Sequence, residues 1–343
     1  MRGTRGSTTS LYGQPGPRVA PWVKGLLLAG AAVGLPTLAS AVIRRRAEPP
    51  SPPRWGRAHR YSDRHGEIVF QELGLRQAGR PPIVLLHSFG PGHDSSEWRA
   101  AAEILAERHP VYALDLPGWG RSAAPPRGAW RPSFYVEALQ GFLGRVVGEP
   151  AVLAASGLPA AYAVRVAAER PGLLRALALV SPLGLDGGGV GGGGGGGDAF
   201  LGRLLRLPVV RETILDLLTS RSSITHHLRK EVYAAPERVD AALLDHHYRG
   251  SHVGRSRQAL AAYLSGDLGD DVATVLPELG VPVWIAWGRK SAAPRVEDAD
   301  RWLHRLPHTA ELEVFETAGA LPHAEAPAAF ARSLGRFVEG ISA

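Results

Sequence analysis

Residues 151–164 read AVLAASGLPAAYAV, an apolar run that stops at a corner of small residues and continues into an alanine-rich stretch. The pattern predicts a buried strand, a sharp turn and a helix. Such a turn lifts one side chain above the edge of a sheet, where it can act as a nucleophile. The residue at the apex is either Ser156 or Gly157, and the two alternatives give different chemistry.

Strands and helices alternate on both sides of this corner. Short apolar runs predict strands over 67–72, 83–87, 111–115, 151–155, 175–180, 282–287 and 311–316. Helical patterns are expected around 96–108, 133–147, 159–169, 296–305 and 325–338. Continuous apolar strands that alternate with helices indicate an α/β fold with a mostly parallel, doubly wound sheet.

A long insertion, 184–278, separates the two parts of this predicted core, 60–183 and 279–343. It begins with the low-complexity run GGGVGGGGGGG (187–197) and continues as helical segments without a strand pattern. We interpret it as a Gly-rich hinge followed by a helical cap. The cap is expected over the carboxyl edge of the sheet, where open α/β sheets bind ligands.

The N-terminal region has a different composition. Residues 1–24 are predicted to be a disordered basic leader, and 44–59 a Pro/Arg linker. Between them, 25–43 form an uncharged apolar run of 19 residues, long enough to be a transmembrane or signal-anchor helix. The arginines at 44–46 would keep the large domain cytoplasmic by the positive-inside rule. The alternatives are a signal cleaved near 39–41, which gives a secreted protein, and a peripheral or buried helix.

Charge and composition exclude several classes of function. The chain has a net charge of +7, but residues 1–60 hold ten Lys/Arg and one acid, which leaves 29 basic and 31 acidic residues in the remainder. We therefore expect no nucleic-acid partner. Cysteine is absent, which excludes disulfides, thiolate metal sites and a cysteine nucleophile. The histidine pairs of the insertion lack a carboxylate that completes a zinc set, so no metal and no cofactor are expected.

Several motifs occur in the order typical of one superfamily. They are IVLLHSFGPGHDSSEW (83–98), DLPGWGRS (115–122), AERPGLLRALALVSP (168–182), PVWIAWG (282–288) and ALPHAEAPAAF (320–330). With them, the chain resembles capped members of the α/β-hydrolase superfamily, of the AB hydrolase-1 type, over about residues 60–343. The resemblance implies the α/β-hydrolase fold and a nucleophile, acid and histidine in that order along the chain. It also implies hydrolysis of esters, amides, epoxides or C–halogen bonds.

The resemblance also indicates which residues take these three positions. A proline ends the elbow helix about fourteen residues after the nucleophile; here it is Pro171, which favours Gly157 at the apex. Ser291 takes the position of the acid, and Ala320 that of the histidine. Removing triad members lowers rates by about 10⁴ to 10⁶. We therefore expect a membrane-tethered protein without the standard triad that binds a small apolar molecule or a protein partner.

The alternative is an active serine hydrolase with a displaced constellation of Ser156, Asp186 and His323. Without such a role, Asp186 would simply begin the Gly loop and His323 would cap the final helix. Cofactor-free lyase or dioxygenase chemistry is a third option, but it usually needs the missing histidine. In every case the resemblance implies an oxyanion-like corner around the elbow. Its residues are Gly157, Leu158, Ser88 and Phe89, with the backbone N–H groups of Leu158 and Phe89 as donors.

Overall fold

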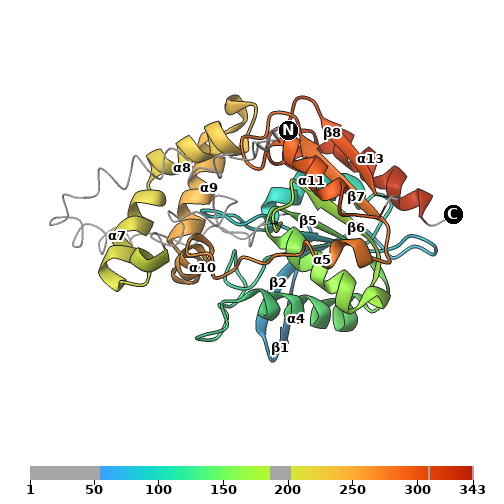
Figure 1. The fold of residues 1–343 in the computed structure, drawn as a ribbon, viewed down its shortest axis with the longest axis horizontal. Coiled ribbons are helices and arrows are strands. Elements are labelled where there is room, and N and C mark those ends of the chain that lie inside the picture. Colours follow the sequence, from blue (N-terminus) through green and yellow to red (C-terminus); the bar gives the residue numbers. More distant parts are fainter. Residues whose placement is uncertain (1–54, 186–201, 308–309, 342–343) are drawn as a thin grey trace, which may run out of the picture.

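The computed structural model describes residues 55–185, 202–307 and 310–341, and a single sheet organises them (Figure 1). Its eight strands lie in the order β1-β2-β4-β3-β5-β6-β7-β8. They are β1 (Arg57–Asp63), β2 (Gly66–Leu73), β3 (Ile83–Leu86), β4 (Val111–Leu114), β5 (Ala151–Ser156), β6 (Leu174–Val180), β7 (Val283–Gly288) and β8 (Glu311–Phe315). The pairs β1–β2 and β2–β4 are antiparallel and the others are parallel. The predicted α/β fold with a mostly parallel sheet is confirmed.

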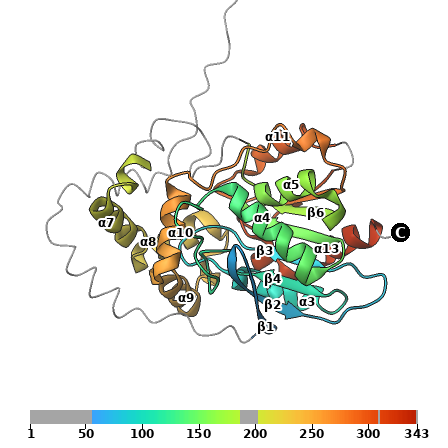
Figure 2. The same ribbon diagram turned by 90° about the horizontal axis from the view of Figure 1, so that it is seen from below.

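Helices cover both faces of the sheet (Figure 2). One face carries α3 (Arg99–Leu105) and α13 (Pro327–Gly340), which pack on each other. The other face carries α4 (Pro132–Phe142), α5 (Pro159–Glu169) and α11 (Ala299–Leu303). Because both faces are covered, the central strands β3 and β5 are buried along their whole length, as their apolar runs predict.

The insertion forms a helical cap beside the core (Figures 1 and 2). It contains α7 (Pro208–Leu218), α8 (Arg221–His227), α9 (Ala241–His252) and α10 (Gly254–Leu264). A four-residue helix, α12 (Pro322–Glu325), precedes α13. Short 3-10 turns lie at Ser95–Trp98 (η1), Pro171–Leu173, Pro236–Arg238, Leu276–Glu278 and Val296–Asp298, and π turns at Leu143–Val147 and Leu228–Val232.

Strand β1 is missing from the sequence prediction and begins inside the segment read as a linker. Its sequence, RAHRYSD, contains no large aliphatic side chain and gives no apolar signal. It lies at the edge of the sheet and pairs only with β2, so most of its side chains are exposed or half-buried. Polar edge strands of this kind protect a sheet against further pairing.

The N-terminal predictions lie outside the described residues. The leader, the apolar run 25–43 and most of the linker fall within 1–54, and Asp186 and the whole Gly run 187–197 fall within 186–201. In the parts of the chain that are described, no helix combines the length and the apolar character that a bilayer crossing requires.

The DLPGWGRS segment supports the sheet edge rather than chemistry. The buried carboxylate of Asp115 accepts hydrogen bonds from the N–H groups of Ser95 (2.9 Å) and Arg121 (2.9 Å). A Cβ at position 120 would lie 2.4 Å from that carboxylate, which explains the glycine there. The turn therefore fixes η1, and with it the loop that faces the elbow.

Candidate functional site

The chain turns sharply at Gly157, directly after β5. Ser156 is the last residue of the strand and pairs in register with Val180. Gly157 has φ +64, in the left-handed region that glycine tolerates best, and α5 begins two residues later. The strand–turn–helix of the prediction is therefore present, with a glycine at its corner.

Ser156 lies behind this corner and not on top of it. Its side chain belongs to a residue that is 1% exposed, and its Oγ has no hydrogen-bond partner among the described residues. A hydroxyl becomes a strong nucleophile only when a base stands within hydrogen-bond reach. The described part of the chain supplies no such base to Ser156.

Ser88 is the residue that lies beside the turn at Gly157. A Cβ added at position 157 would lie 3.4 Å from Ser88 Cβ and 3.9 Å from Ser88 Cα, with no other atom within 4 Å beyond the adjacent residues. A Cβ at this position therefore meets only ordinary contacts, although the positive φ would strain it. The hydroxyl nearest to this point of the turn is carried by Ser88.

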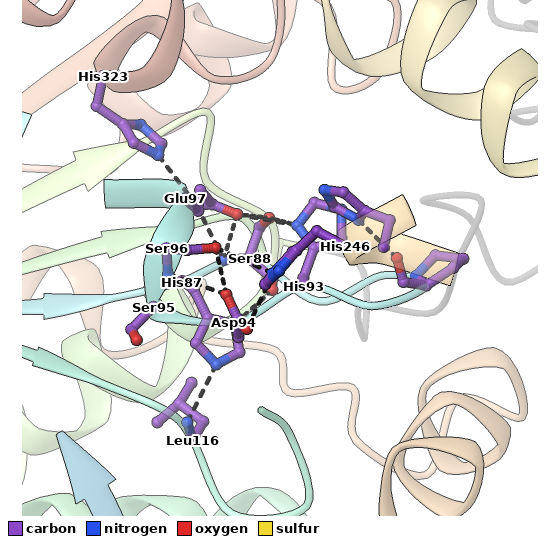
Figure 3. A network of polar contacts seen from close by, with 12 residues as sticks. His87, Ser88, His93, Asp94, Ser95, Ser96, Glu97, Leu116, His246 and His323 are labelled. Carbon is purple, nitrogen blue, oxygen red and sulfur yellow. Dashed lines mark hydrogen bonds and ion pairs between the residues drawn. The ribbon is translucent and has the colours of Figure 1, made fainter. Parts of the chain in front are cut away.

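A buried carboxylate, Glu97 of η1, holds Ser88 and two histidines (Figure 3). The Ser88 hydroxyl donates to Glu97 Oε2 (2.5 Å), and the Ser88 N–H lies 3.1 Å and 3.2 Å from the two carboxylate oxygens. His93 Nδ1 is 2.9 Å from Oε2, and His323 Nε2 is 3.0 Å from Oε1. The Glu97 side chain is 4% exposed. We call these four residues the Glu97 network.

The Glu97 network contains Ser, His and Glu side chains, but their hydrogen bonds do not connect them in the way a catalytic triad requires. Burial opposes ionisation of Glu97, but the hydrogen bonds from His323 and His93 outweigh it and hold its pKa well below the usual range. Such a carboxylate is a weak base. Burial also lowers the pKa of His93, whose Nδ1 contacts both Ser88 Oγ (2.9 Å) and Glu97. With Nδ1–H directed to the carboxylate, His93 cannot also accept the Ser88 proton there.

His323, on α12, contacts Glu97 Oε1, whereas Ser88 and His93 contact Oε2. Its ring stacks on Trp98 with centroids 3.7 Å apart, and the residue is fully buried. Its Nδ1 has no partner among the described residues. The structure thus brings His323 to Glu97 and gives it no hydrogen bond to Ser156. Asp186, the third member of the displaced constellation, is outside the described residues.

The expected positions of the acid and the histidine lie on two adjoining loops after β7 and β8. Backbone contacts join the loops: Lys290 N–H donates to Ala318 O (2.9 Å). Ser291 is 7% exposed, and its Oγ has no partner in the described ranges. Ala320 donates its N–H to Val232 O of the cap (2.8 Å). Neither side chain can orient or accept a proton as a carboxylate and an imidazole do.

The oxyanion-like corner retains its two donors. Leu158 and Phe89 are 1% and 6% exposed, and neither backbone N–H donates to another described residue. Buried N–H groups without a partner are rare in folded proteins, so these two are available to a ligand oxygen. The Phe89 ring stacks on Trp119 at 4.7 Å and also contacts Tyr162 and Tyr263. The two N–H groups therefore lie beside a cluster of aromatic rings around Phe89.

A separate groove of about 260 Å³ borders the Glu97 network on the cap side. Its lining includes His93, Glu97, Tyr233, His247 and Ala324. Burial lowers the pKa of His247 to about 3, and its Nδ1 is 2.8 Å from Pro91 O. The groove therefore combines a neutral imidazole and apolar side chains with charged ones, since Asp94, Arg99 and Glu103 also line it.

An ion pair joins the cap to the loop that carries the Glu97 network. Asp94 Oδ2 lies 3.0 Å from Nε2 of His246 on α9. The Asp94 carboxylate raises the pKa of His246 against the effect of burial. Burial disfavours the charge on Asp94, but His246 and Ser96 outweigh it and lower the pKa of Asp94.

Sequence reasoning missed Glu97 and His93. A signal was present, because His93 and Glu97 are four residues apart in HDSSEW and could meet on one helical turn. The partner His323 is 226 residues away, and no local pattern links it to Glu97. Among residues 55–185, 202–307 and 310–341, no group of three His, Asp or Glu side chains is placed to hold a metal ion.

The fold and the corner define a capped protein of the α/β-hydrolase class. A sequence profile of the alpha/beta hydrolase family matches residues 83–333, and the chain belongs to this family. An uncharacterized protein of Mycobacterium tuberculosis (strain ATCC 25618 / H37Rv) is 27% identical over 288 residues, which cover 78% of this chain and 79% of the relative.

Solved structures agree on the fold. A serine hydrolase involved in carbazole degradation, the CarC enzyme, superposes with a TM-score of 0.66 at 19% identity and covers 82% of this chain and 98% of its own. A membrane phospholipase A, described as a bacterial virulence factor, superposes with a TM-score of 0.65 at 22% identity, over 93% of this chain and 98% of its own. At these identities the likeness shows the fold alone.

Proposed function

We propose that this α/β-hydrolase-family protein has no hydrolase activity of the standard kind and acts by binding. The observation that carries the proposal is Gly157, which stands at the turn with φ +64 and offers no side chain for attack. Two further observations support it. Ser156 Oγ has no partner among the described residues, and His323 Nε2 is bound to Glu97.

Hydrolysis of p-nitrophenyl esters of short and medium acids tests this proposal. The full chain is expected to show the same rate as its Ser156→Ala and Ser88→Ala variants, at the level of uncatalysed hydrolysis. The matched gain-of-function variant is Gly157→Ser combined with Ser291→Asp and Ala320→His, which places all three groups at the family positions. A rate in the native chain that falls at least about tenfold in Ser156→Ala overturns the proposal and favours the displaced serine hydrolase.

The ligand is proposed to be a small, largely apolar molecule with one oxygen acceptor. The unpaired N–H groups of Leu158 and Phe89 would bind the oxygen, and the Phe89–Trp119 pair would contact the apolar part. A protein partner is the alternative occupant. Octanoate is a suitable probe because it combines an alkyl chain with a carboxylate.

Two substitutions separate the elbow from the groove as the place of binding. Gly157→Leu would fill the open space above the turn, whereas Ala324→Leu would fill the groove beside Glu97. Calorimetric titration with octanoate should show binding that Gly157→Leu abolishes and Ala324→Leu retains. Loss in Ala324→Leu alone would instead place the ligand in the groove, and no binding to the native chain would contradict the ligand proposal.

We also propose that residues 25–43 tether the protein to a membrane and leave the large domain on the cytoplasmic side. The uncharged run and the arginines that follow it support this proposal. Alkaline carbonate extraction of membranes should leave the full chain in the pellet and release a Leu27→Arg/Leu28→Arg variant. An intact mass that lacks the first 41 or so residues would instead indicate a cleaved signal and a secreted protein.

A further inference from the structure

The cap helix α7 lies at the edge of the molecule farthest from the sheet (Figures 1 and 2). Three large hydrophobic residues of the described part are exposed: Leu75 (79%), Leu207 (54%) and Leu217 (37%). Leu207 directly precedes α7 and Leu217 lies in its last turn. Single exposed leucines are common, so the charges around this pair decide whether it has a role.

The acidic side chains of α7, Glu212 and Asp216, are partly exposed and bind the neighbouring helix α10. Glu212 and Asp216 both bind Arg257 of α10, each at 2.8 Å, and the Arg257 side chain is 6% exposed. Leu215 and Leu218 are buried in the main hydrophobic core. At about 100° per residue, Leu217 lies about 100° around the helix from both Asp216 and the buried Leu218, so it stands at the border of the packed face. The ion pairs with Arg257 hold this face against α10, and the exposed fractions of Leu207 and Leu217 show that both side chains reach solvent.

Three arginines and one partly exposed acid, Glu212, lie near these two leucines, so the exposed charge there is mostly positive. Arg203 and Arg206 are exposed and form no ion pair with another described residue. Arg211 is 39% exposed and contacts only its neighbour Glu212, at 3.4 Å. We call Arg203, Arg206, Leu207, Arg211 and Leu217 the α7 patch. It combines two leucines with three arginines.

We propose that the α7 patch docks on an anionic lipid surface. The leucines would enter the boundary between headgroups and acyl chains, and the arginines would contact lipid phosphates while their stems lie along the apolar surface. The apolar area is small, so the contact is weak and sensitive to salt. The inference goes beyond the proposed function, because it does not require residues 25–43 to cross the membrane or the corner at Gly157 to bind a ligand.

The absence of cysteine allows a site-specific test in the full chain. Leu217→Cys carries the environment-sensitive dye NBD on the α7 patch. Leu75→Cys is the matched control. Leu75 lies in the loop between β2 and β3, which leads into the amino end of β3, opposite the cap. Each labelled protein is mixed with phosphatidylcholine vesicles, with and without about 30% phosphatidylserine.

NBD emission at position 217 should rise about twofold with the anionic vesicles and fall back at high salt, while position 75 shows no rise. Arg203→Glu/Arg206→Glu should abolish the rise. Arg170→Glu/Arg175→Glu, the same charge change at exposed arginines before and within β6, should leave it intact. No rise at 217, an equal rise at 75, or equal effects of the two charge reversals would overturn the proposal. A rise without vesicles that grows with protein concentration would indicate a second copy as the partner and would also overturn it.

Discussion

The imidazole of His323 is bound to Glu97, with Nε2 3.0 Å from Oε1, and both side chains are buried. Glu97 follows the loop that faces the elbow, so this ion pair ties the C-terminal helices to that loop. A carboxylate with several donors around it stabilises the loop and is a poor proton acceptor. The Glu97 network therefore connects Ser88 and His93 of this loop to His323 of α12.

Replacing Glu97 by Gln should destabilise the protein by about 2–3 kcal/mol, because buried donors of Ser88, His93 and His323 lose a charged acceptor. Chemical denaturation measures the change. Glu103→Gln is the control: this acid is 48% exposed, pairs with Arg99, and should cost no more than about 0.5 kcal/mol. Equal effects of the two substitutions would contradict the structural role of the Glu97 network.

Two glycines with positive φ should respond differently to alanine. Gly157→Ala should cost only about 1 kcal/mol, from backbone strain, because the new Cβ meets Ser88 Cβ at an ordinary 3.4 Å. Gly120→Ala should cost about 3 kcal/mol or more, because its Cβ would lie 2.4 Å from the Asp115 carboxylate. Denaturation midpoints compare the two variants. A severe loss in Gly157→Ala would mean that the space above the turn is not open.

The ion pair of His246 with Asp94 should make stability depend on pH. The pKa of His246 is raised in the folded protein, so its contribution is complete below the unfolded value of about 6.5 and is lost as pH rises through the folded value. His246→Gln should therefore be less stable than the native chain by about 1 kcal/mol near pH 5.5, and the difference should vanish at alkaline pH.

The charged groups that face His246 are Asp94, Asp115 and Arg121, and the lowered pKa of Asp94 keeps that carboxylate ionised over this range. Buried His93 and His247 titrate in both proteins, so their effects cancel in the difference. His304→Gln, at an exposed histidine, is the control. A difference that grows toward alkaline pH would have the wrong sign for this ion pair.

Glu325 should hold the cap against the core. Its carboxylate accepts from the N–H groups of Gly319 (2.5 Å), Ala234 (2.9 Å) and Ala235 (3.1 Å). In Glu325→Gln the amide can no longer accept at both positions, and hydrogen exchange at these three N–H groups should become about tenfold faster. Glu313→Gln on β8, which replaces the carboxylate that accepts from Ser333 of α13, should leave them unchanged.

Local patterns predicted the sheet because its central strands are apolar on both faces, as β5 shows. They also predicted the sharp turn, since small residues interrupt the strand at Ser156-Gly157. They did not reveal β1, whose polar side chains carry no burial signal. The Glu97 network escaped prediction for another reason: three of its members are close in the chain, but His323 lies 226 residues from Glu97, and no local pattern reveals such a contact.

Covalent labelling with a fluorophosphonate, with the site read by mass spectrometry, tests most directly whether the elbow has a working nucleophile. The full chain is expected to remain unlabelled at Ser156 and Ser88, while Gly157→Ser with Ser291→Asp and Ala320→His acquires the adduct at position 157. An adduct on Ser156 of the native chain, lost in Ser156→Ala, would contradict the account and identify an active serine hydrolase.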